Sequence, residues 1–241
     1  MRALEPLALS RPAGEDDRRY VRHVCGYGCV RCASTIFQYR TLSGSDDVDD
    51  IILICPPCAH ALTGKEGAER ALRTMRERPL ARQKLFDRRK LPYSNLLPDV
   101  TVVPGVTMHN VPVPILFSGM PVLRVGPPET PGGSVEISVA LGAAGNVESE
   151  PQQIIATNEW MPKGDDGDWT FERPGNNYVI TSRDRSAQLI IAIVTPSHLA
   201  IELLRSHGRG KMLESGQLGT RLDGVARPTP PARSQLVGMA I

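Results

Sequence analysis

Two Cys-x-x-Cys pairs place the strongest constraint on the fold of this 241-residue chain. Cys29 and Cys32 form the first pair, Cys55 and Cys58 form the second, and 22 residues separate the two pairs. Two such turns bring four thiolates to one point, and four thiolates bind Zn²⁺ tetrahedrally with Zn–S distances near ~2.3 Å. We therefore predict a zinc site made of these four cysteines. Because four sulfurs leave no ligand position for water or substrate, this zinc is expected to be structural.

Reduced core thiols or two disulfides are the alternative for these cysteines. The first residues lack the apolar core of a signal peptide. Polar residues interrupt the apolar stretch 189–204, so this stretch does not provide the ~18 consecutive apolar residues that a membrane-spanning helix needs. We therefore expect a cytoplasmic protein without membrane contact, a setting that disfavours disulfides. Cys25 lies outside the paired spacing and is predicted to be a buried core residue.

The pattern of apolar residues divides the chain into five segments. Residues 1–17 are predicted to be an N-terminal arm, residues 18–90 a compact zinc domain, and residues 91–98 a linker. Residues 99–210 hold short apolar runs separated by Pro and Gly, which is typical of a β-sandwich. The Gly- and Pro-rich residues 211–241 are predicted to be a disordered tail. The expected fold is α+β: a small zinc-bound ββα domain followed by an all-β, sandwich-like domain.

Within the first domain, the residues between and after the cysteine pairs predict a hairpin and a helix. Residues 36–39 and 51–54 are strand-like apolar runs joined by an acidic turn. Residues 66–78 place apolar side chains at i, i+3, i+4 and i+7, so they predict an amphipathic helix that ends before Pro79.

This predicted helix opens a basic segment, because residues 65–90 carry 10 basic against 4 acidic residues. Such density is the electrostatic signature of binding to the phosphate backbone of DNA or RNA. The residues predicted to contact phosphates are Arg70, Arg73, Arg76, Arg78, Arg82, Lys84, Arg88 and Arg89. The alternative is a solvated helical face on which arginines pair with Glu66, Glu69 and Glu77.

The second domain has the opposite charge balance, with 7 basic against 12 acidic residues over positions 91–210. It is therefore not expected to follow a phosphate backbone, and a protein partner is the alternative. Its aromatic residues are interpreted as core residues rather than as a ligand site: Trp160, Trp169, Phe171 and Tyr178.

The runs from Tyr20 to Cys32, from Ile36 to Arg40 and from Asp50 to Cys58 together resemble the HNH endonuclease family, in its subgroup with a four-cysteine zinc knuckle. The resemblance covers about residues 18–80. It implies a hairpin and helix that hold one catalytic divalent metal, a histidine as general base, an asparagine that positions it and a later histidine as metal ligand.

The chain differs from this family pattern at each of these positions. The histidine pair falls on Arg40 and Thr41, the asparagine on Asp50 and the ligand histidine on Ala59. Arginine, with a pKa above ~12, cannot serve as a general base near neutral pH. The resemblance therefore implies a catalytically degenerate HNH-like protein that acts as a nucleic-acid-binding or interaction module.

Two other functions remain open. In the first, the chain is an active endonuclease. Its catalytic candidates are His60, which lies one residue beyond the expected metal ligand, and Asp50. Further oxygen ligands of Mg²⁺ would come from the acidic residues of the hairpin turn, Asp46, Asp47 and Asp49. Against this, His60 would simply line the first turn of a helix and the acids would form a solvated loop. In the second, the chain is an assembly protein that uses its zinc knuckle as a structural clip.

Overall fold

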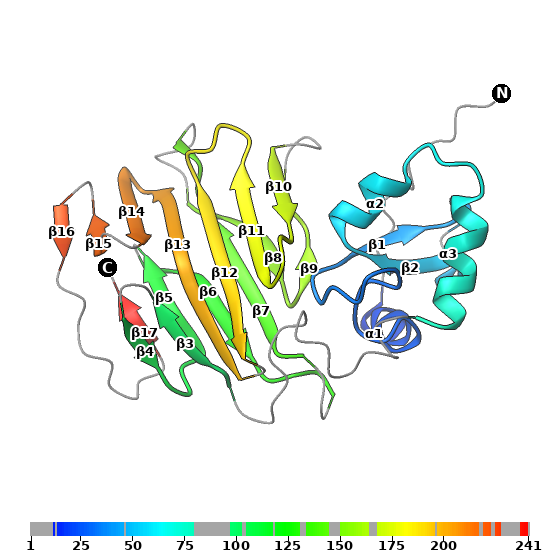
Figure 1. The fold of residues 1–241 in the computed structure, drawn as a ribbon, viewed down its shortest axis with the longest axis horizontal. Helices are drawn as coiled ribbons and strands as arrows, with labels where there is room; N and C mark the ends of the chain where they lie inside the picture. Colours follow the sequence, from blue (N-terminus) through cyan, green and yellow to red (C-terminus); the bar gives the residue numbers. More distant parts are fainter. Residues whose placement is uncertain are drawn as a thin grey trace. The chain divides into compact units, whose positions relative to one another are not determined.

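The computed structural model describes residues 12, 14–45, 47–79, 97–102, 105–117, 119–130, 134–144, 150–163, 168–195, 197–216, 219–222, 225–227 and 237–240. The fold is mixed α+β with a predominance of strands, as predicted (Figure 1). The chain forms two compact units, residues 1–90 and 91–241. No helix in the described ranges is long and apolar enough to cross a membrane.

The first unit is built on an antiparallel hairpin. Strand β1 (Gln38–Thr41) pairs with β2 (Ile51–Ile54), and the 3-10 turn η1 (Val48–Asp50) leads into β2. All four residues of β2 are fully buried, which explains why this strand is a continuous apolar run in the sequence. Helices α2 (Pro56–Leu62) and α3 (Ala68–Glu77) follow the hairpin. The described helix α3 lies within the predicted range 66–78.

Helix α1 (Glu15–Val24) precedes the hairpin and differs from the prediction of an arm that extends to residue 17. Residues 15–17, which the sequence placed in the arm, form the acidic first turn of this helix, where negative side chains interact favourably with the helix dipole. The helix is tied to the hairpin region, because Arg22 donates to the Tyr39 hydroxyl at 3.0 Å and the Tyr20 hydroxyl donates to Asp49 at 2.9 Å.

The second unit consists of two sheets. Its strands are β3 (Asp99–Val102), β4 (Val106–Met108), β5 (Val113–Phe117), β6 (Met120–Gly126), β7 (Glu136–Leu141), β8 (Gln152–Ala156), β9 (Glu159–Trp160), β10 (Trp169–Glu172), β11 (Asn177–Ser182), β12 (Gln188–Thr195), β13 (His198–Gly208), β14 (Lys211–Gly216), β15 (Gly219–Leu222), β16 (Val225–Arg227) and β17 (Val237–Ala240). Over the described residues, one sheet has six strands in the order β17-β5-β6-β7-β8-β9. The other has nine, with β10 to β16 in sequence order and β3 and β4 joined to it through β13.

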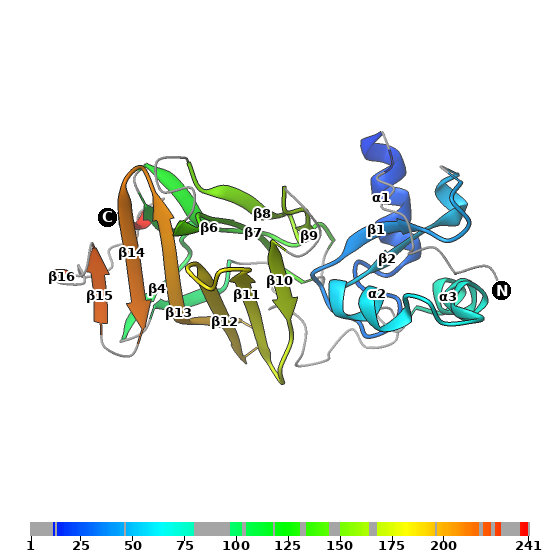
Figure 2. The same ribbon diagram turned by 90° about the horizontal axis from the view of Figure 1, so that it is seen from above.

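These two sheets lie one behind the other, as the two views of the second unit show (Figures 1 and 2). Aromatic side chains make contact between them: the rings of Trp160 on β9 and Phe171 on β10 lie 5.6 Å apart. Phe171 in turn stacks on Tyr178 at 5.6 Å. The interpretation of the four aromatic residues as core residues agrees with their burial, since Trp160, Trp169, Phe171 and Tyr178 are all buried.

The structure also places strands in residues 211–241, where the sequence suggested a disordered tail. Strands β13 and β14 form a hairpin in which Gly208 pairs with Lys211. Its two turn residues, Arg209 and Gly210, have φ of 49° and 75°, as a two-residue hairpin turn requires. Within the segment, Gly216 ends β14 and Gly219 begins β15, whereas the glycine content alone suggested disorder.

Candidate metal centre

The first cysteine pair lies in the loop between α1 and β1. The Ala33 amide donates to the Cys29 carbonyl at 2.8 Å, and Ala33 adopts a left-handed conformation with φ of 60°. The Val30 amide donates to the Leu53 carbonyl at 3.0 Å, which fixes this loop against β2. The loop is therefore a tight turn held at a defined place beside the hairpin.

The second cysteine pair lies where β2 ends and α2 begins. Cys55 is the N-cap residue of α2, Pro56 and Pro57 occupy the first helical positions, and Cys58 lies in the first turn. Proline is suited to these positions because the amides there need no helical partner. The Ala59 amide donates to the Cys55 carbonyl at 3.0 Å and closes the turn.

These two turns bring the four predicted cysteine sulfurs together. The Sγ atoms of Cys29, Cys32, Cys55 and Cys58 all lie within 4.8 Å of one another, and those of Cys32 and Cys55 are 3.5 Å apart. A regular ZnS₄ tetrahedron with Zn–S near ~2.3 Å has sulfurs about 3.8 Å apart. The predicted cluster is confirmed, and its spacing fits one metal ion of the size of Zn²⁺.

The electrostatics of the cluster favour a bound cation. Burial raises the pKa of the Cys29 thiol well above its ordinary value. The pKa of Cys55 is raised by hydrogen bonds with the other three thiols, of which the bond with Cys29 has the largest effect. A hydrogen bond from Cys29 lowers the pKa of Cys58. Because burial disfavours the charged form, thiolates at these positions would need a compensating positive charge, which a divalent ion with soft ligands supplies.

Cys25 lies outside this cluster, in agreement with its predicted role as a core residue. It is fully buried at the end of α1 and its Sγ accepts the Leu53 amide at 3.4 Å.

Asp50, the catalytic candidate from the hairpin region, is buried and surrounded by donors. Its Oδ2 accepts hydrogen bonds from the Thr41 hydroxyl at 2.8 Å and from the Ser43 amide and hydroxyl at 2.7 Å each. Its Oδ1 accepts one from Arg73 at 2.5 Å. Burial alone would raise the pKa of Asp50, but the bonds from Ser43, Thr41 and Arg73 outweigh it and hold this pKa well below its usual range. Asp50 is thus an ionised acceptor with both oxygens occupied.

His60, the other catalytic candidate, is exposed on α2. Within the described ranges, only the four cysteines form a group of three or more Cys, His, Asp or Glu side chains that could hold a metal. The structure therefore does not combine His60 with Asp47, Asp49 or Asp50 into a second metal-binding group. Asp46 lies outside the described residues.

Two of the arginines predicted to contact phosphates have partners inside the first unit. Arg73 pairs with Asp50 and with Glu69, the latter at 3.1 Å and a helical spacing of i,i+4. Arg76 donates to the carbonyls of Ile51 and Val48 at 3.1 Å each. The alternative of pairing with glutamates along the helix applies to Arg73 through Glu69, whereas Arg76 contacts the hairpin region instead.

The remaining predicted phosphate contacts divide into two groups. Arg70 and Arg78 are exposed on or beside α3. Arg82, Lys84, Arg88 and Arg89 lie outside the described residues. The contacts of Arg73 and Arg76 with the hairpin region could not be found from the sequence, because their partners lie 23 to 28 residues away with no periodic relation.

Comparison of the chain with protein-family models, with curated proteins and with solved structures finds no significant match.

Proposed function

We propose that the first unit is a zinc-stabilised, HNH-like module that binds a partner and lacks HNH catalysis. The observation that carries this proposal is the convergence of the four cysteine sulfurs within 4.8 Å. Zn²⁺ is the ion that best matches four thiolates in a tetrahedral arrangement. With all four ligand positions filled by sulfur, the ion has no position for water and acts as a structural link.

A zinc ion at this site would link two segments that lie far apart in the sequence. Cys29 and Cys32 belong to the loop after α1, whereas Cys55 and Cys58 belong to the start of α2. A metal that joins them fixes the loop and α2 against the hairpin. Small units have limited cores, and structural zinc contributes on the order of 10 kcal/mol to folding in comparable sites.

The absence of catalysis is supported by the surroundings of Asp50. A residue that positions a general base or a metal-bound water needs an oxygen available to it. Both oxygens of Asp50 already accept hydrogen bonds from protein groups. The endonuclease alternative has less support than the binding module for this reason, and because Arg40 and Ala59 occupy two further positions of the family pattern.

The phosphate backbone of DNA or RNA is the proposed partner. Arg70 is exposed on α3, and the chain continues from this helix into a segment rich in Arg and Lys. Arg73 and Arg76 are assigned to contacts within the unit rather than to the partner. Because lysine and arginine contacts with phosphates are not specific for bases, little sequence preference is expected.

Fluorescence anisotropy with a labelled DNA duplex and a labelled RNA, over a series of salt concentrations, tests this proposal. Charge reversal by Arg70→Glu should weaken binding and lower the slope of log K against log salt by about one phosphate contact, or roughly 0.9. Arg124→Glu, a reversal of an exposed arginine on β6 of the second unit, is the matched control and should leave binding unchanged. If the wild-type protein binds neither nucleic acid at low salt, the assembly function replaces this proposal.

A further inference from the structure

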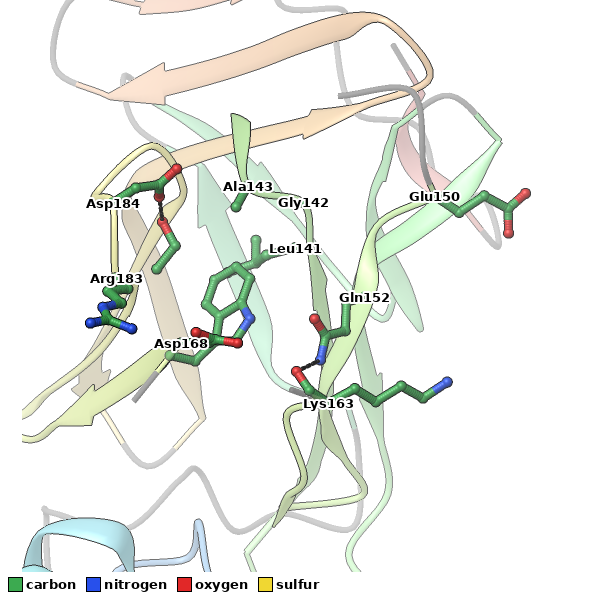
Figure 3. A pocket seen from close by; sticks show the side chains of 11 residues that line it. Leu141, Gly142, Ala143, Glu150, Gln152, Lys163, Asp168, Arg183 and Asp184 are labelled. Carbon is green, nitrogen blue, oxygen red and sulfur yellow. Dashed lines mark hydrogen bonds between the residues drawn. The ribbon is translucent and has the colours of Figure 1, made fainter. Parts of the chain in front are cut away.

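A pocket of about 810 Å³ lies in the second unit around Asp168 (Figure 3). Its described lining comes from the end of β7, the start of β8 and the region where β10 and β11 pair. The apolar side chains of Leu141 and Trp169 in this lining are buried, and Glu150 is paired with Arg209 at 2.6 Å. The described lining therefore does not select one class of ligand, whereas the cysteine cluster of the first unit has chemistry that its described geometry does specify.

Exposure distinguishes the four cysteines of the metal centre. Cys32, in the loop after α1, is half-buried, whereas the other three cysteines of the centre are buried. An oxidant that arrives from solvent must contact a sulfur in order to oxidise it, so Cys32 is the ligand residue that it meets first. Cys25, outside the cluster, is fully buried and its sulfur accepts the Leu53 amide, so it is shielded from the same oxidant.

A second sulfur lies next to that of Cys32. The Sγ atoms of Cys32 and Cys55 are 3.5 Å apart, and Cys55 is 3% exposed. An accessible cysteine beside a resolving cysteine is the arrangement typical of peroxide-sensitive sites, because the second sulfur captures the oxidised one before it is oxidised further. Cys32 and Cys55 thus match the two roles that a reversible oxidation requires.

From these features we infer that the metal centre is a peroxide-sensitive switch, in which hydrogen peroxide converts Cys32 and Cys55 into a disulfide and the zinc is released. This inference rests on the zinc site of the proposed function. The Cys32 thiolate attacks one oxygen of the peroxide, the O–O bond breaks and hydroxide leaves, which gives a sulfenic acid on Cys32. The Cys55 thiolate then attacks the Cys32 sulfur, so that the S–S bond forms, the S–O bond breaks and a second hydroxide leaves. The two sulfurs together lose two electrons, and the peroxide is reduced to two hydroxide ions.

The oxidised centre keeps the link between its two segments but loses its affinity for the ion. Cys29 and Cys58 are the thiolates that remain, and a structural zinc site needs four ligands. Cys32 belongs to the loop after α1 and Cys55 is the N-cap residue of α2, so the disulfide joins the same two segments that the ion joins. Because this link is retained, a thiol reductant together with zinc should restore the original site.

Titration of the zinc-loaded full-length protein with hydrogen peroxide tests this inference. A chromogenic chelator measures the zinc released, and peptide mass spectrometry after alkylation of the free thiols identifies the disulfide. The expected result is about one zinc released for each Cys32–Cys55 disulfide, with Cys25 still a free thiol and with recovery of the site by dithiothreitol and zinc. A first disulfide that lacks Cys32, oxidation of Cys25 at the same rate, or no zinc release by peroxide that oxidises free cysteine in the same solution would each overturn the inference.

Matched substitutions identify the sulfur that reacts first. Cys32→His and Cys58→His each keep four potential zinc ligands, since three cysteines and one histidine also form structural sites. Cys32→His removes the half-buried sulfur, so peroxide should release its zinc at least about tenfold more slowly than from wild type. Cys58→His keeps the Cys32–Cys55 pair and should release zinc as readily as wild type. Equal rates of release from the two variants would contradict the role of Cys32, and if either variant does not bind zinc, the disulfide found in wild type decides.

These measurements separate the switch from the proposed function, because none of them involves nucleic acid. Zinc release with a Cys32–Cys55 disulfide in a protein that binds neither DNA nor RNA would support the switch and reject the binding module. Nucleic-acid binding by a protein that retains its zinc in peroxide would do the reverse. Well under one zinc per chain before any peroxide is added would overturn both.

Discussion

Arg73 of α3 and Asp50 at the end of η1 form an ion pair of 2.5 Å between Nη2 and Oδ1, although they lie 23 positions apart in the chain. The Asp50 side chain is 8% exposed and that of Arg73 is 44% exposed. The sequence indicated one of these residues for catalysis and the other for phosphate binding. The structure joins them as a contact that holds α3 against the hairpin region.

Removal of the Asp50 carboxylate should destabilise the first unit. Asp50→Ala leaves the donors of Thr41, Ser43 and Arg73 without their acceptor, and the expected loss is about 2 to 4 kcal/mol. Hydrogen exchange over residues 38–54, followed by mass spectrometry, measures this loss locally. Asp49→Ala is the matched control, because its carboxylate is 67% exposed, and it should cost less than about 1 kcal/mol. Equal protection in both variants would contradict the role given to Asp50.

The stabilisation by Asp50 should also depend on pH. Its pKa in the folded protein is held below the unfolded value of ~3.9, so the contribution is complete above that value. It is lost as the pH falls from ~3.9 toward the folded-state pKa. The difference in unfolding free energy between wild type and Asp50→Asn should be constant between about pH 5 and 7 and shrink below about pH 4. Any effect of acid on the cysteines is shared by both proteins and cancels in this difference.

The cysteines should separate into ligands and a non-ligand. Cys29→Ser and Cys58→Ser should each lose bound zinc and unfold the first unit, because binding energy at such a site is folding energy. Cys25→Ala should retain one zinc per chain, since its sulfur lies outside the cluster. Plasma mass spectrometry of the purified variants gives the metal content. Loss of zinc from the Cys25 variant equal to that from the Cys29 variant would show that the ligand set is wrong.

Plasmid DNA should not be nicked by the protein with either Mg²⁺ or Mn²⁺. A general base contributes typically 10²- to 10⁴-fold to such a reaction, and Arg40 stands where the family pattern has a histidine. The assay compares wild type with His60→Ala. Robust nicking that disappears in the His60 variant would restore the endonuclease function, whereas nicking that is equal in both would indicate contamination.

The features that could be predicted from sequence are those with local or periodic signals. The cysteine spacing defines the sulfur cluster, and the apolar run at residues 51–54 corresponds to the whole of β2. Residues 99–210, predicted to be β-rich from short apolar runs separated by Pro and Gly, hold strands β3 to β13. Strands β4, β9 and β10 have two to four residues, too few for a pattern to be distinguished from a loop.

Other features depend on context that spacing does not carry. The acidic residues 15–17 were interpreted as part of an irregular arm, because their favourable position at a helix N-terminus becomes apparent only once α1 is known. Arg76 lies in a basic run, yet its guanidinium donates to carbonyls next to the hairpin. The pocket around Asp168 combines the ends of strands from two sheets, and no motif connects them.

X-ray absorption spectroscopy at the zinc edge, on reduced full-length protein with its metal content determined, tests the central claim most directly. The account predicts one zinc per chain with four sulfur neighbours near ~2.3 Å and no nitrogen or oxygen neighbour. Well under one zinc per chain, or an oxygen or nitrogen ligand in place of a sulfur, would contradict a closed structural site.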